Sequence, residues 1–442
     1  MATGNIRECR VVRADIDVPG IHGYDTYIEY GGYTALRAVL GWEPGRIIQQ
    51  ITASGLTGRG GGGFPTGRKW HTVATSVGTP YVVVNGDESE PGAFKDRELM
   101  EKLPHRILEG ALIAASAVKA EEVTFFIRGE YPLAFERIRD AVEEAKAAGI
   151  VGALVPVSVH LHQSAGAYIC GEETALIAAL SGERPVPTGK PPYPAVSGLN
   201  GRPTLLNNVE TFANVPAIVI HGPDWYRGMG LPEAPGTRVF SVSGNVARPG
   251  NYEVELGTRL VDLIDGLAGG VPHGHAIKAV IPGGTSAPLL TPDNLAVSLA
   301  PEPLRAAGSM LGTASVIVYD ETHCMVDLAA NMSLFYRDES CGKCTPCRDG
   351  THFLEQLLRR VEEGRGTMKD LDRLRLICDY IPGESLCALG DGAVAPVLSS
   401  LTHFRDEYEA HVALGACPVR KRYQVAGQCF PVLHEVPTRP LT

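Results

Sequence analysis

Long hydrophobic runs are missing from this chain of 442 residues. No stretch of about 18 apolar residues could span a bilayer, and the first residues lack the apolar core of a signal peptide. An extended basic block is also lacking. The 40 basic residues are outnumbered by 50 acidic ones, giving a formal net charge of −10, which argues against a nucleic-acid-binding surface. We therefore expect a cytoplasmic protein whose anionic ligands are met by local positive charge.

The chain has ten cysteines, and three of them form a CxxCxxC run at Cys341, Cys344 and Cys347. Thiols two residues apart rarely have the geometry of a disulfide. Thiolates are soft ligands, and two-residue gaps allow successive sulfurs to converge on one iron–sulfur cluster. Zinc also accepts four thiolates, but its sites usually show two separated pairs. The run therefore predicts a [4Fe-4S] cluster.

The fourth cluster ligand must come from further along the chain, where two cysteines follow the run. Cys378 lies on the same helical face as Leu371, Leu374 and Ile381, and this spacing suits a small buried residue. Cys387 lies in a glycine-bearing turn, where the backbone can approach a cluster closely. We therefore predict Cys387 as the fourth ligand.

The densest glycine cluster lies between residues 55 and 70. Every residue from 58 to 63 is glycine except Arg59. Such a loop allows consecutive N–H groups to point at an anion and leaves room for a flat ring, while Arg68 and Lys69 add positive charge. A flexible linker is the alternative, although linkers favour serine and repetition. The loop predicts a site for a phosphate-bearing nucleotide.

Strand and helix patterns alternate after this loop. The run Tyr81–Asn85 is typical of a buried parallel strand, and ligands collect at the carboxyl ends of such strands. Asn85, Asp87, Glu88 and Glu90 follow there, although a solvated acidic turn is an alternative. The pattern predicts a Rossmann-like, doubly wound α/β sheet. The further elements that we expect are a helix at 105–118, a strand at 122–127, a helix at 132–148 and a strand at 155–161.

Two further segments have the composition of ligand walls. Lys190 and Tyr193 offer a cation beside an aromatic ring, and residues 207–211 offer amide and hydroxyl groups at a helix start. Glu172 and Glu173 open another helix. Because carboxylates are favoured in the first turn of a helix, capping alone could explain that pair.

The remainder of the chain divides into two differently patterned parts. Residues 238–319 show strand, strand, helix and strand, which suggests a small β-grasp domain. After residue 323 the periodicity is helical, and four helices of this length make a bundle that could clamp a cluster. The helices that we expect span 326–335, 351–362, 368–381 and 393–408.

Taken together, these motifs resemble a known family. GRGGGGFPTGRKW, NGDESEPG, GAYICGEETAL, KPPYPAVSGL, NNVETFANV, ESCGKCTPCRDGT and SLCALGDG occur in one order and cover roughly residues 25–415. The chain is similar to the NADH-binding, NADH-oxidising flavin subunit (the 51 kDa type) of bacterial respiratory complex I. Related subunits serve NAD-linked hydrogenases and formate dehydrogenases.

The resemblance implies a set of site residues. FMN contacts are expected from Gly58, Arg59, Gly60, Gly61, Lys69, Asn85, Asp87, Tyr168, Gly171, Glu172, Asn207, Asn208 and Thr211. NADH contacts are expected from Phe64, Lys190 and Tyr193, with Glu90 and Glu173 positioning the nicotinamide end. The cluster ligands are Cys341, Cys344, Cys347 and Cys387. No side chain is expected to act as a catalytic acid or base, because the cofactors carry out the hydride transfer.

The resemblance also implies a role and partners. NADH is oxidised by FMN, and electrons pass singly to the cluster and on to other subunits, as in the electron-input subunit of NADH:quinone oxidoreductase. The expected partners are a [2Fe-2S] thioredoxin-like subunit and a larger iron–sulfur subunit of a peripheral arm, at the cytoplasmic face of the inner membrane. Membrane contact is expected only through that complex. The alternatives are the diaphorase subunit of a soluble hydrogenase or formate dehydrogenase, and a non-catalytic scaffold braced by a cluster.

We expect four parts along the chain: an FMN- and NADH-binding domain at 1–230, a β-grasp (SLBB or ubiquitin-like) domain at 236–322, a helical bundle at 323–415 and a tail at 416–442. The tail carries Cys417 and Cys429, which are inert or bind something together with a partner. Cys9, Cys170 and Cys324 are expected to be small buried residues.

Overall fold

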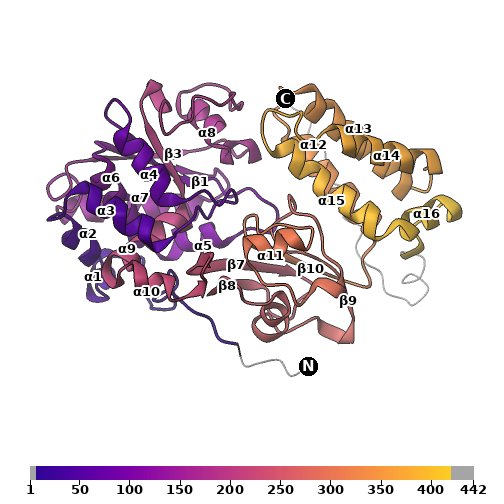
Figure 1. Cartoon of the computed structure of the whole chain (residues 1–442), viewed down its shortest axis with the longest axis horizontal. Helices are drawn as coiled ribbons and strands as arrows, with labels where there is room; N and C mark the ends of the chain where they lie inside the picture. Colours follow the sequence, from indigo (N-terminus) through magenta and orange to yellow (C-terminus); the bar gives the residue numbers. More distant parts are fainter. Residues whose placement is uncertain (1–5, 420–442) are drawn as a thin grey trace.

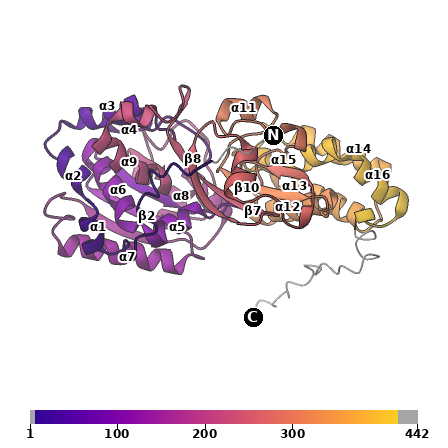
Figure 2. The ribbon, with the colours of Figure 1, turned by 90° about the horizontal axis from the view of Figure 1, so that it is seen from below.

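The computed structural model of the protein describes residues 6–419. Figure 1 shows an α/β part at one end of an elongated molecule, a second sheet in the middle and a group of helices at the other end. The perpendicular view in Figure 2 shows the same order. Within the described residues, no helix is long and apolar enough to cross a membrane.

The elements of the α/β part follow one another from α1 to α10. The helices are α1 (Tyr24–Glu29), α2 (Thr34–Val39), α3 (Pro44–Ser54), α4 (Thr66–Thr75), α5 (Lys95–Lys102), α6 (Pro104–Val118), α7 (Pro132–Ala147), α8 (Glu173–Leu180), α9 (Val209–His221) and α10 (Pro223–Arg227). The strands are β1 (Tyr81–Gly86), β2 (Glu122–Ile127), β3 (Ser158–Gln163) and β4 (Thr204–Asn208). A short 3₁₀ helix, η1 (Tyr168–Gly171), precedes α8.

The first sheet is entirely parallel, with strand order β3-β2-β1-β4. Alternate side chains point to opposite faces. Val82 and Val84 join the large core built with α6 and α9, whereas Val83 packs on the other face with Cys170 and Leu176. The predicted parallel α/β arrangement is therefore confirmed, and the expected elements agree with it to within a few residues.

The second sheet is mixed, with order β8-β7-β10-β9. Its strands are β7 (Thr237–Gly244), β8 (Gly250–Glu255), β9 (Ile277–Ile281) and β10 (Ser315–Asp320). β10 runs parallel to β7, whereas β8 is antiparallel to β7 and β9 is antiparallel to β10. Two-residue strands β5 (Gly230–Leu231) and β6 (Ala234–Pro235) precede this sheet. A π-helical turn, η3 (Asp262–Leu267), lies where a helix was predicted in this part of the chain. The other helical elements here are α11 (Pro301–Ala306) and the short 3₁₀ turns η4 (Pro272–Gly274) and η5 (Pro292–Asn294). One more 3₁₀ turn, η2 (Leu199–Gly201), precedes β4 in the α/β part.

The C-terminal helices share their own core. They are α12 (Met325–Glu339), α13 (Thr345–Glu362), α14 (Met368–Tyr380), α15 (Leu389–His403) and α16 (Arg405–Leu414). The prediction of one helix over 393–408 was wrong. The chain breaks at Phe404, whose φ of −127° and ψ of 33° are not helical, so α15 and α16 are separate. Cys378 is 1% exposed within α14, as its helical spacing predicted.

Hydrogen bonds connect the second sheet directly to the glycine-rich loop and to α9. Arg238 is buried and donates from Nη2 to the carbonyl oxygens of Arg59 at 3.2 Å and Gly312 at 2.6 Å. Glu210 of α9 accepts the N–H of Val239 at 3.0 Å. These buried charged hydrogen bonds hold the loop against a neighbouring part of the protein.

Candidate functional site

The candidate nucleotide site, called the cleft below, is the group of predicted residues at the carboxyl edge of the first sheet. From β1 the chain runs outward through β2 to β3 and then crosses back to add β4 on the other side of β1, so the strand order reverses between β1 and β4. Ligands of open α/β sheets bind at such a switch point. Asn85 at the end of β1 is the register partner of Asn208 at the end of β4. The sheet therefore brings together two predicted segments that are far apart in the sequence.

The glycine-rich loop begins beside this edge. It is closed at its base by hydrogen bonds from Gly58 N–H to the Phe64 carbonyl at 2.9 Å and from Thr66 N–H to the Leu56 carbonyl at 2.9 Å. A Cβ on Gly60 would lie 3.3 Å from Cβ of Asn208. The loop is thus pinned at its ends and meets the end of β4.

The tip of the loop has the open space that a flat cofactor requires. Gly61 and Gly63 have positive φ angles of 112° and 62°, which favour glycine. A Cβ built on Gly62 or Gly63 would meet nothing within 4 Å. The loop therefore presents bare backbone to open space, which fits the predicted nucleotide.

Arg59 contributes differently from its neighbours. Its side chain is 1% exposed, and its guanidinium donates to the Thr57 hydroxyl at 2.7 Å, the Tyr226 hydroxyl at 2.8 Å and the Thr237 carbonyl at 3.0 Å. Its backbone N–H donates to Thr211 Oγ1 at 2.9 Å. The guanidinium is thus occupied inside the protein, and the main-chain N–H and carbonyl of Arg59 are bonded to Thr211 and Arg238, so that Arg59 fixes the position of the loop.

The end of β1 carries an ordered polar turn. Asn85 donates from Nδ2 to the Gly171 carbonyl at 3.1 Å and accepts the N–H of Asp87 at 3.0 Å. Asp87 accepts hydroxyl hydrogen bonds from Ser89 at 2.5 Å and Ser164 at 2.9 Å. Burial raises the pKa of Asp87 to about 6, although these hydroxyls act in the opposite direction. The turn therefore holds an acid whose charge changes near neutral pH.

Side chains of alternating charge connect the end of the glycine-rich loop to the start of α8 and to the segment around Lys190. Lys190 contacts Glu172 at 2.9 Å and Glu173 at 2.7 Å, and Lys69 lies 3.4 Å from Glu173. Burial by itself would raise the pKa of Glu173, but the two ammonium groups hold it below the ordinary value. Glu172 also caps α8 by accepting N–H groups of the first turn. Capping and ion pairing therefore both apply to this acidic pair.

Two aromatic rings of the same segments are exposed. Phe64 is 46% exposed and Tyr193 is 57% exposed. Arg68 and Lys69 lie 5.6 and 6.0 Å from the centre of the Phe64 ring. A cation over the face of an aromatic ring is a favourable contact, and here it leaves the Phe64 ring exposed beside positive charge. The exposed rings fit the predicted wall for a planar anionic ligand.

Glu90 is further from solvent than the sequence indicated, because it is 7% exposed. Its carboxylate accepts the Tyr168 hydroxyl at 2.7 Å, the Ser286 N–H at 2.7 Å and the Thr285 hydroxyl at 3.2 Å. Burial raises its pKa. Glu90, which closely follows β1, therefore connects the first sheet to the loop between β9 and β10 of the second sheet.

The four predicted cluster ligands come together at the end of the helices that faces the α/β part. Cys347 is buried, and Cys341, Cys344 and Cys387 pack around the same small core. The Leu386 N–H donates to Cys344 Sγ at 3.2 Å, which brings the second cysteine segment onto the first. The pKa of Cys347 is raised by burial, and the neighbouring thiols Cys341 and Cys344 raise it further.

These thiols are the donors that an iron–sulfur cluster requires. Four thiolates are the usual ligands of a [4Fe-4S] cluster. The donor set therefore supports the predicted metal centre.

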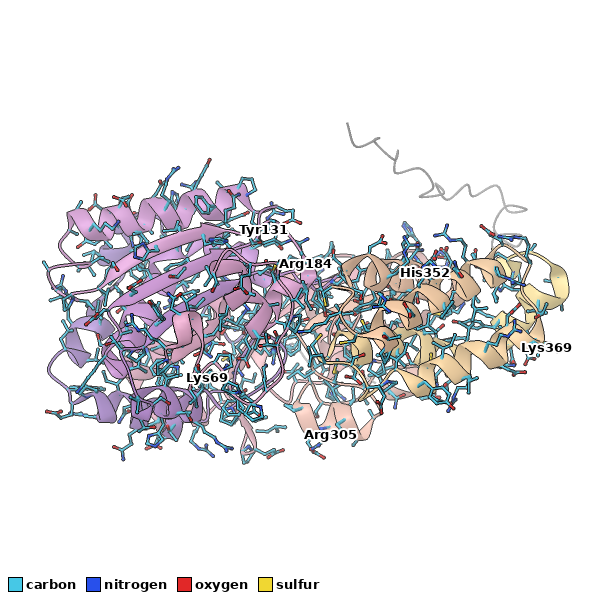
Figure 3. The ribbon with its side chains drawn as sticks, turned by 90° about the horizontal axis from the view of Figure 1, so that it is seen from above. Lys69, Tyr131, Arg184, Arg305, His352 and Lys369 are labelled. Carbon is cyan, nitrogen blue, oxygen red and sulfur yellow. The ribbon has the colours of Figure 1, made fainter. Side chains whose placement is uncertain are left out.

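Hydrogen bonds connect the segment around the cysteine run directly to the α/β part. The N–H of Tyr168 donates to Glu339 at 2.8 Å, Arg184 donates to the Cys341 carbonyl at 3.0 Å, and Lys343 donates to the Pro187 carbonyl at 2.8 Å. Figure 3 shows Arg184 at the border between the α/β part and the helices. Both candidate cofactor sites therefore share one boundary.

Several residues at these sites were not predicted from the sequence. Lys95 is buried between Asp96 at 2.8 Å and Glu210 at 2.9 Å, and Asp96 accepts from Asn208 at 2.7 Å. The only sequence signal for Lys95 and Asp96 is that they closely follow the acidic turn at residues 87–90. Thr285 has no such signal, because its contact with Glu90 joins segments distant in sequence.

Three family models match the chain. They are described as the Nuo51 FMN-binding domain at residues 51–217, the SLBB domain at 239–289 and the NADH-ubiquinone oxidoreductase-F iron-sulfur binding region at 327–411. The first and last cover the cleft and the cysteine run. Fold and site together define a flavin- and iron–sulfur-dependent oxidoreductase subunit.

Two bacterial relatives identify the family. The chain is 47% identical over 415 residues to the F 2 subunit of NADH-quinone oxidoreductase from Rhizobium meliloti (strain 1021), covering 92% of this chain and 99% of the relative. It is 49% identical over 409 residues to the F-type subunit of NADH-quinone oxidoreductase from Mycobacterium bovis (strain ATCC BAA-935 / AF2122/97), covering 90% and 92%. The chain belongs to the family of F-type subunits of NADH-quinone oxidoreductase.

Hydrogenase subunits are also similar. The NADP-reducing hydrogenase subunit HndC of Solidesulfovibrio fructosivorans is 42% identical, with 89% of this chain and 81% of the relative covered. A crystal structure of an NAD⁺-reducing [NiFe]-hydrogenase in the air-oxidised state aligns with a TM-score of 0.81 at 34% identity, covering 92% of this chain and 67% of that one.

Proposed function

We propose that this protein oxidises NADH as the electron-input subunit of an NADH:quinone oxidoreductase. When bound, FMN would take hydride from NADH, and the [4Fe-4S] cluster would accept the electrons one at a time. The observation that carries the proposal is the shared boundary: the segment around Tyr168 contacts both Glu90 of the cleft and Glu339 beside the cysteine run.

The chain's own residues bind and orient the cofactors and exclude side reactions. The residues proposed to surround FMN are Gly58, Arg59, Gly60, Gly61, Lys69, Asn85, Asp87, Tyr168, Gly171, Glu172, Asn207, Asn208 and Thr211. Those proposed to hold NADH are Phe64, Glu90, Glu173, Lys190 and Tyr193. The proposed cluster ligands are Cys341, Cys344, Cys347 and Cys387.

Individual side chains have distinct tasks in this proposal. The exposed rings of Phe64 and Tyr193 provide stacking surfaces for planar groups. Glu173 is kept ionised by Lys69 and Lys190, so it can accept a hydrogen bond from an amide or hydroxyl. No side chain needs to transfer a proton in the hydride step.

The finer domain assignment is also a proposal. We assign residues 1–230, of which 1–5 lie outside the described residues, to the Rossmann-like, doubly wound domain, residues 236–322 to a β-grasp domain and residues 323–415 to a helical bundle whose main members are α12 to α15. The mixed order β8-β7-β10-β9 with its short helical turn supports the second unit. The common core of α12, α13, α14 and α15 supports the third. Residues 420–442 of the proposed tail lie outside the described residues.

The proposed partners are a [2Fe-2S] thioredoxin-like subunit and a larger iron–sulfur subunit, in a peripheral arm at the cytoplasmic face of the inner membrane. The second candidate is the diaphorase subunit of a soluble hydrogenase, which the similarity to the hydrogenase subunit supports. Co-purification of a tagged chain from its native cells separates the two, because quinone-linked and hydrogenase subunits differ in mass and metal content.

One preparation tests the central proposal. The full-length protein, purified anaerobically and reconstituted with iron and sulfide, should contain FMN and about four irons per chain. NADH should bleach the flavin absorbance, and ferricyanide should restore it. A protein that holds four irons but no FMN, and whose colour comes from the cluster alone, would instead favour the cluster-braced scaffold, and a protein holding neither group would refute the proposal.

A further inference from the structure

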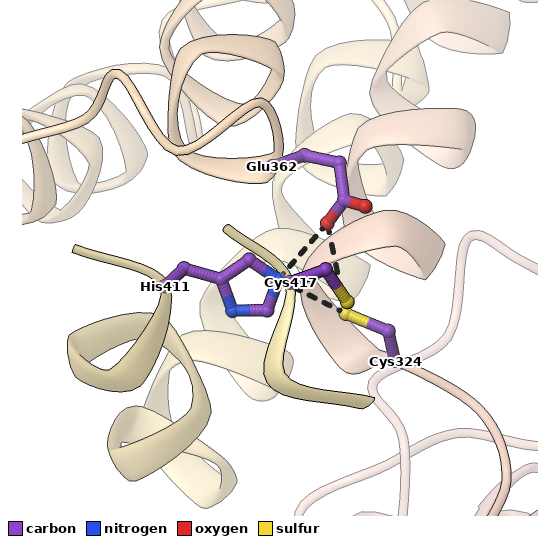
Figure 4. Close-up of side chains that lie close together, drawn as sticks. All are labelled: Cys324, Glu362, His411 and Cys417. Atoms are coloured by element: carbon purple, nitrogen blue, oxygen red, sulfur yellow. Dashed lines mark hydrogen bonds and ion pairs between the residues drawn. The ribbon is translucent and has the colours of Figure 1, made fainter. Parts of the chain in front are cut away.

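A second group of potential metal ligands lies far from the cysteine run, within the C-terminal helices. Cys324 directly precedes α12, Glu362 ends α13, His411 lies in α16 and Cys417 follows that helix. Figure 4 shows the four side chains converging from these separate segments. These four residues are distant along the chain, so no pattern in the sequence links them.

Their donor atoms are spaced as the ligands of one ion should be. One sulfur, nitrogen or oxygen from each residue lies within 4.8 Å of all the others. His411 Nε2 lies 3.1 Å from Glu362 Oε2 and 3.4 Å from Cys324 Sγ, and that sulfur lies 3.6 Å from Glu362 Oε2. Tetrahedral zinc bonds of about 2.0–2.3 Å place neighbouring ligand atoms about 3.3–3.8 Å apart.

The surroundings hold these groups ready to bind. Cys324, His411 and Cys417 are at most 8% exposed, and the Glu362 side chain is 9% exposed. His411 Nδ1 lies 2.7 Å from the Glu407 carbonyl oxygen. A proton on Nδ1 would donate to that carbonyl, leaving the Nε2 lone pair directed at the other three groups.

The donor chemistry selects among metals. Two sulfurs and an imidazole disfavour magnesium and calcium, which prefer oxygen ligands. Four protein donors in a buried, closed arrangement are typical of structural zinc, whereas catalytic zinc retains an open position. The wider set of thiols around Cys347 is separate from this group.

We propose that Cys324, Glu362, His411 and Cys417 bind one zinc ion that fastens the segment after α16 to the start of α12 and the end of α13. The ion would offset two of the three negative charges that two thiolates and a carboxylate bring into the helical core. Its role is structural, and it lies outside the proposed path of electrons.

Metal analysis of the purified full-length holoprotein tests the site. We expect one zinc per chain in addition to the cluster iron, measured by plasma mass spectrometry after dialysis against metal-free buffer. The double variant Cys324→Ala/Cys417→Ala should lose at least nine-tenths of the zinc while retaining the cluster iron. Cys378→Ala is the matched control, since it removes another buried cysteine of the same hydrophobic core and should keep both metals.

A conservative variant keeps the test decisive if the double variant misfolds. His411→Cys supplies another zinc ligand and should retain one zinc, whereas His411→Ala should lose it. X-ray absorption at the zinc edge should show two sulfur neighbours in the wild type and three in His411→Cys.

Three results would overturn the inference. They are wild-type protein that binds less than a tenth of an equivalent of zinc after incubation with zinc sulfate, iron as the only metal in this group, and a Cys324–Cys417 disulfide found by peptide mass mapping of protein purified under reducing conditions.

Discussion

The backbone N–H of Tyr168 donates to the carboxylate of Glu339 at 2.8 Å. Tyr168 begins η1 after strand β3, and Glu339 ends α12, two residues before the first cysteine of the run. The hydroxyl of the same tyrosine donates to Glu90 at 2.7 Å. One residue therefore spans the boundary between the proposed flavin cleft and the proposed cluster.

Replacing Tyr168 with phenylalanine should weaken this boundary. The variant removes the hydroxyl donor to a buried carboxylate, which should cost about 1.5–3 kcal/mol of unfolding free energy. Urea unfolding followed by circular dichroism measures this cost. Tyr380→Phe is the control, because Tyr380 is 69% exposed and should cost almost nothing. Equal costs for the two variants would contradict the assigned hydrogen bond.

Cys347→Ser should separate the two redox sites. Loss of one thiolate should lower the iron content well below that of wild type, while NADH-to-ferricyanide activity stays within about threefold, because the dye can take electrons from the flavin directly. Iron analysis and a steady-state assay check this. Cys378→Ala should change neither quantity. If Cys347→Ser abolished bleaching of the flavin by NADH, the proposed order of transfer would be wrong.

Two neighbouring glycines offer a test of the flavin cradle. Gly62→Ala introduces a methyl group into open space without a positive φ angle, so the apoprotein should keep its stability. Gly63→Ala also enters open space but forces alanine to a φ of 62°, which should cost about 1–2 kcal/mol. Gly62→Ala should also retain FMN binding, whereas the backbone change that Gly63→Ala forces on the loop should weaken binding at least tenfold. Fluorescence titration measures both affinities, and unchanged binding in Gly63→Ala would place the flavin elsewhere.

Glu173 should contribute a stability that depends on pH. Its folded-state pKa is lowered by Lys69 and Lys190, so its contribution is fully present above the unfolded pKa near 4.5 and is lost as pH falls through the lower folded value. Because the side chain is 22% exposed, the contribution should be below about 1 kcal/mol.

The measurement for Glu173→Gln is urea unfolding of variant and wild type at pH 7 and at pH 4 or lower. The difference between them should be larger at pH 7. Glu183→Gln, which changes an exposed acid, should give no such trend. A difference that grew as the pH fell would show that the ion pairs are assigned incorrectly.

Local patterns were sufficient for much of the fold. The strand at 122–127 was predicted with the bounds of β2, and the buried position of Cys378 followed from its helical spacing, because these features depend on neighbours a few residues away. The break at Phe404 was missed because the apolar periodicity continues through it. A helix end without a strong capping signal is decided by how the two helices pack.

The sequence by itself determined the parallel α/β unit, the glycine-rich loop and the cysteine run, because each is encoded in consecutive residues. Only the tertiary structure decided that the Arg59 guanidinium lies in the interior, that Glu90 joins two parts of the protein, and that Cys324 meets Cys417. Those outcomes depend on contacts between distant segments, and the spacing of residues along the chain carries no information about which segments will meet.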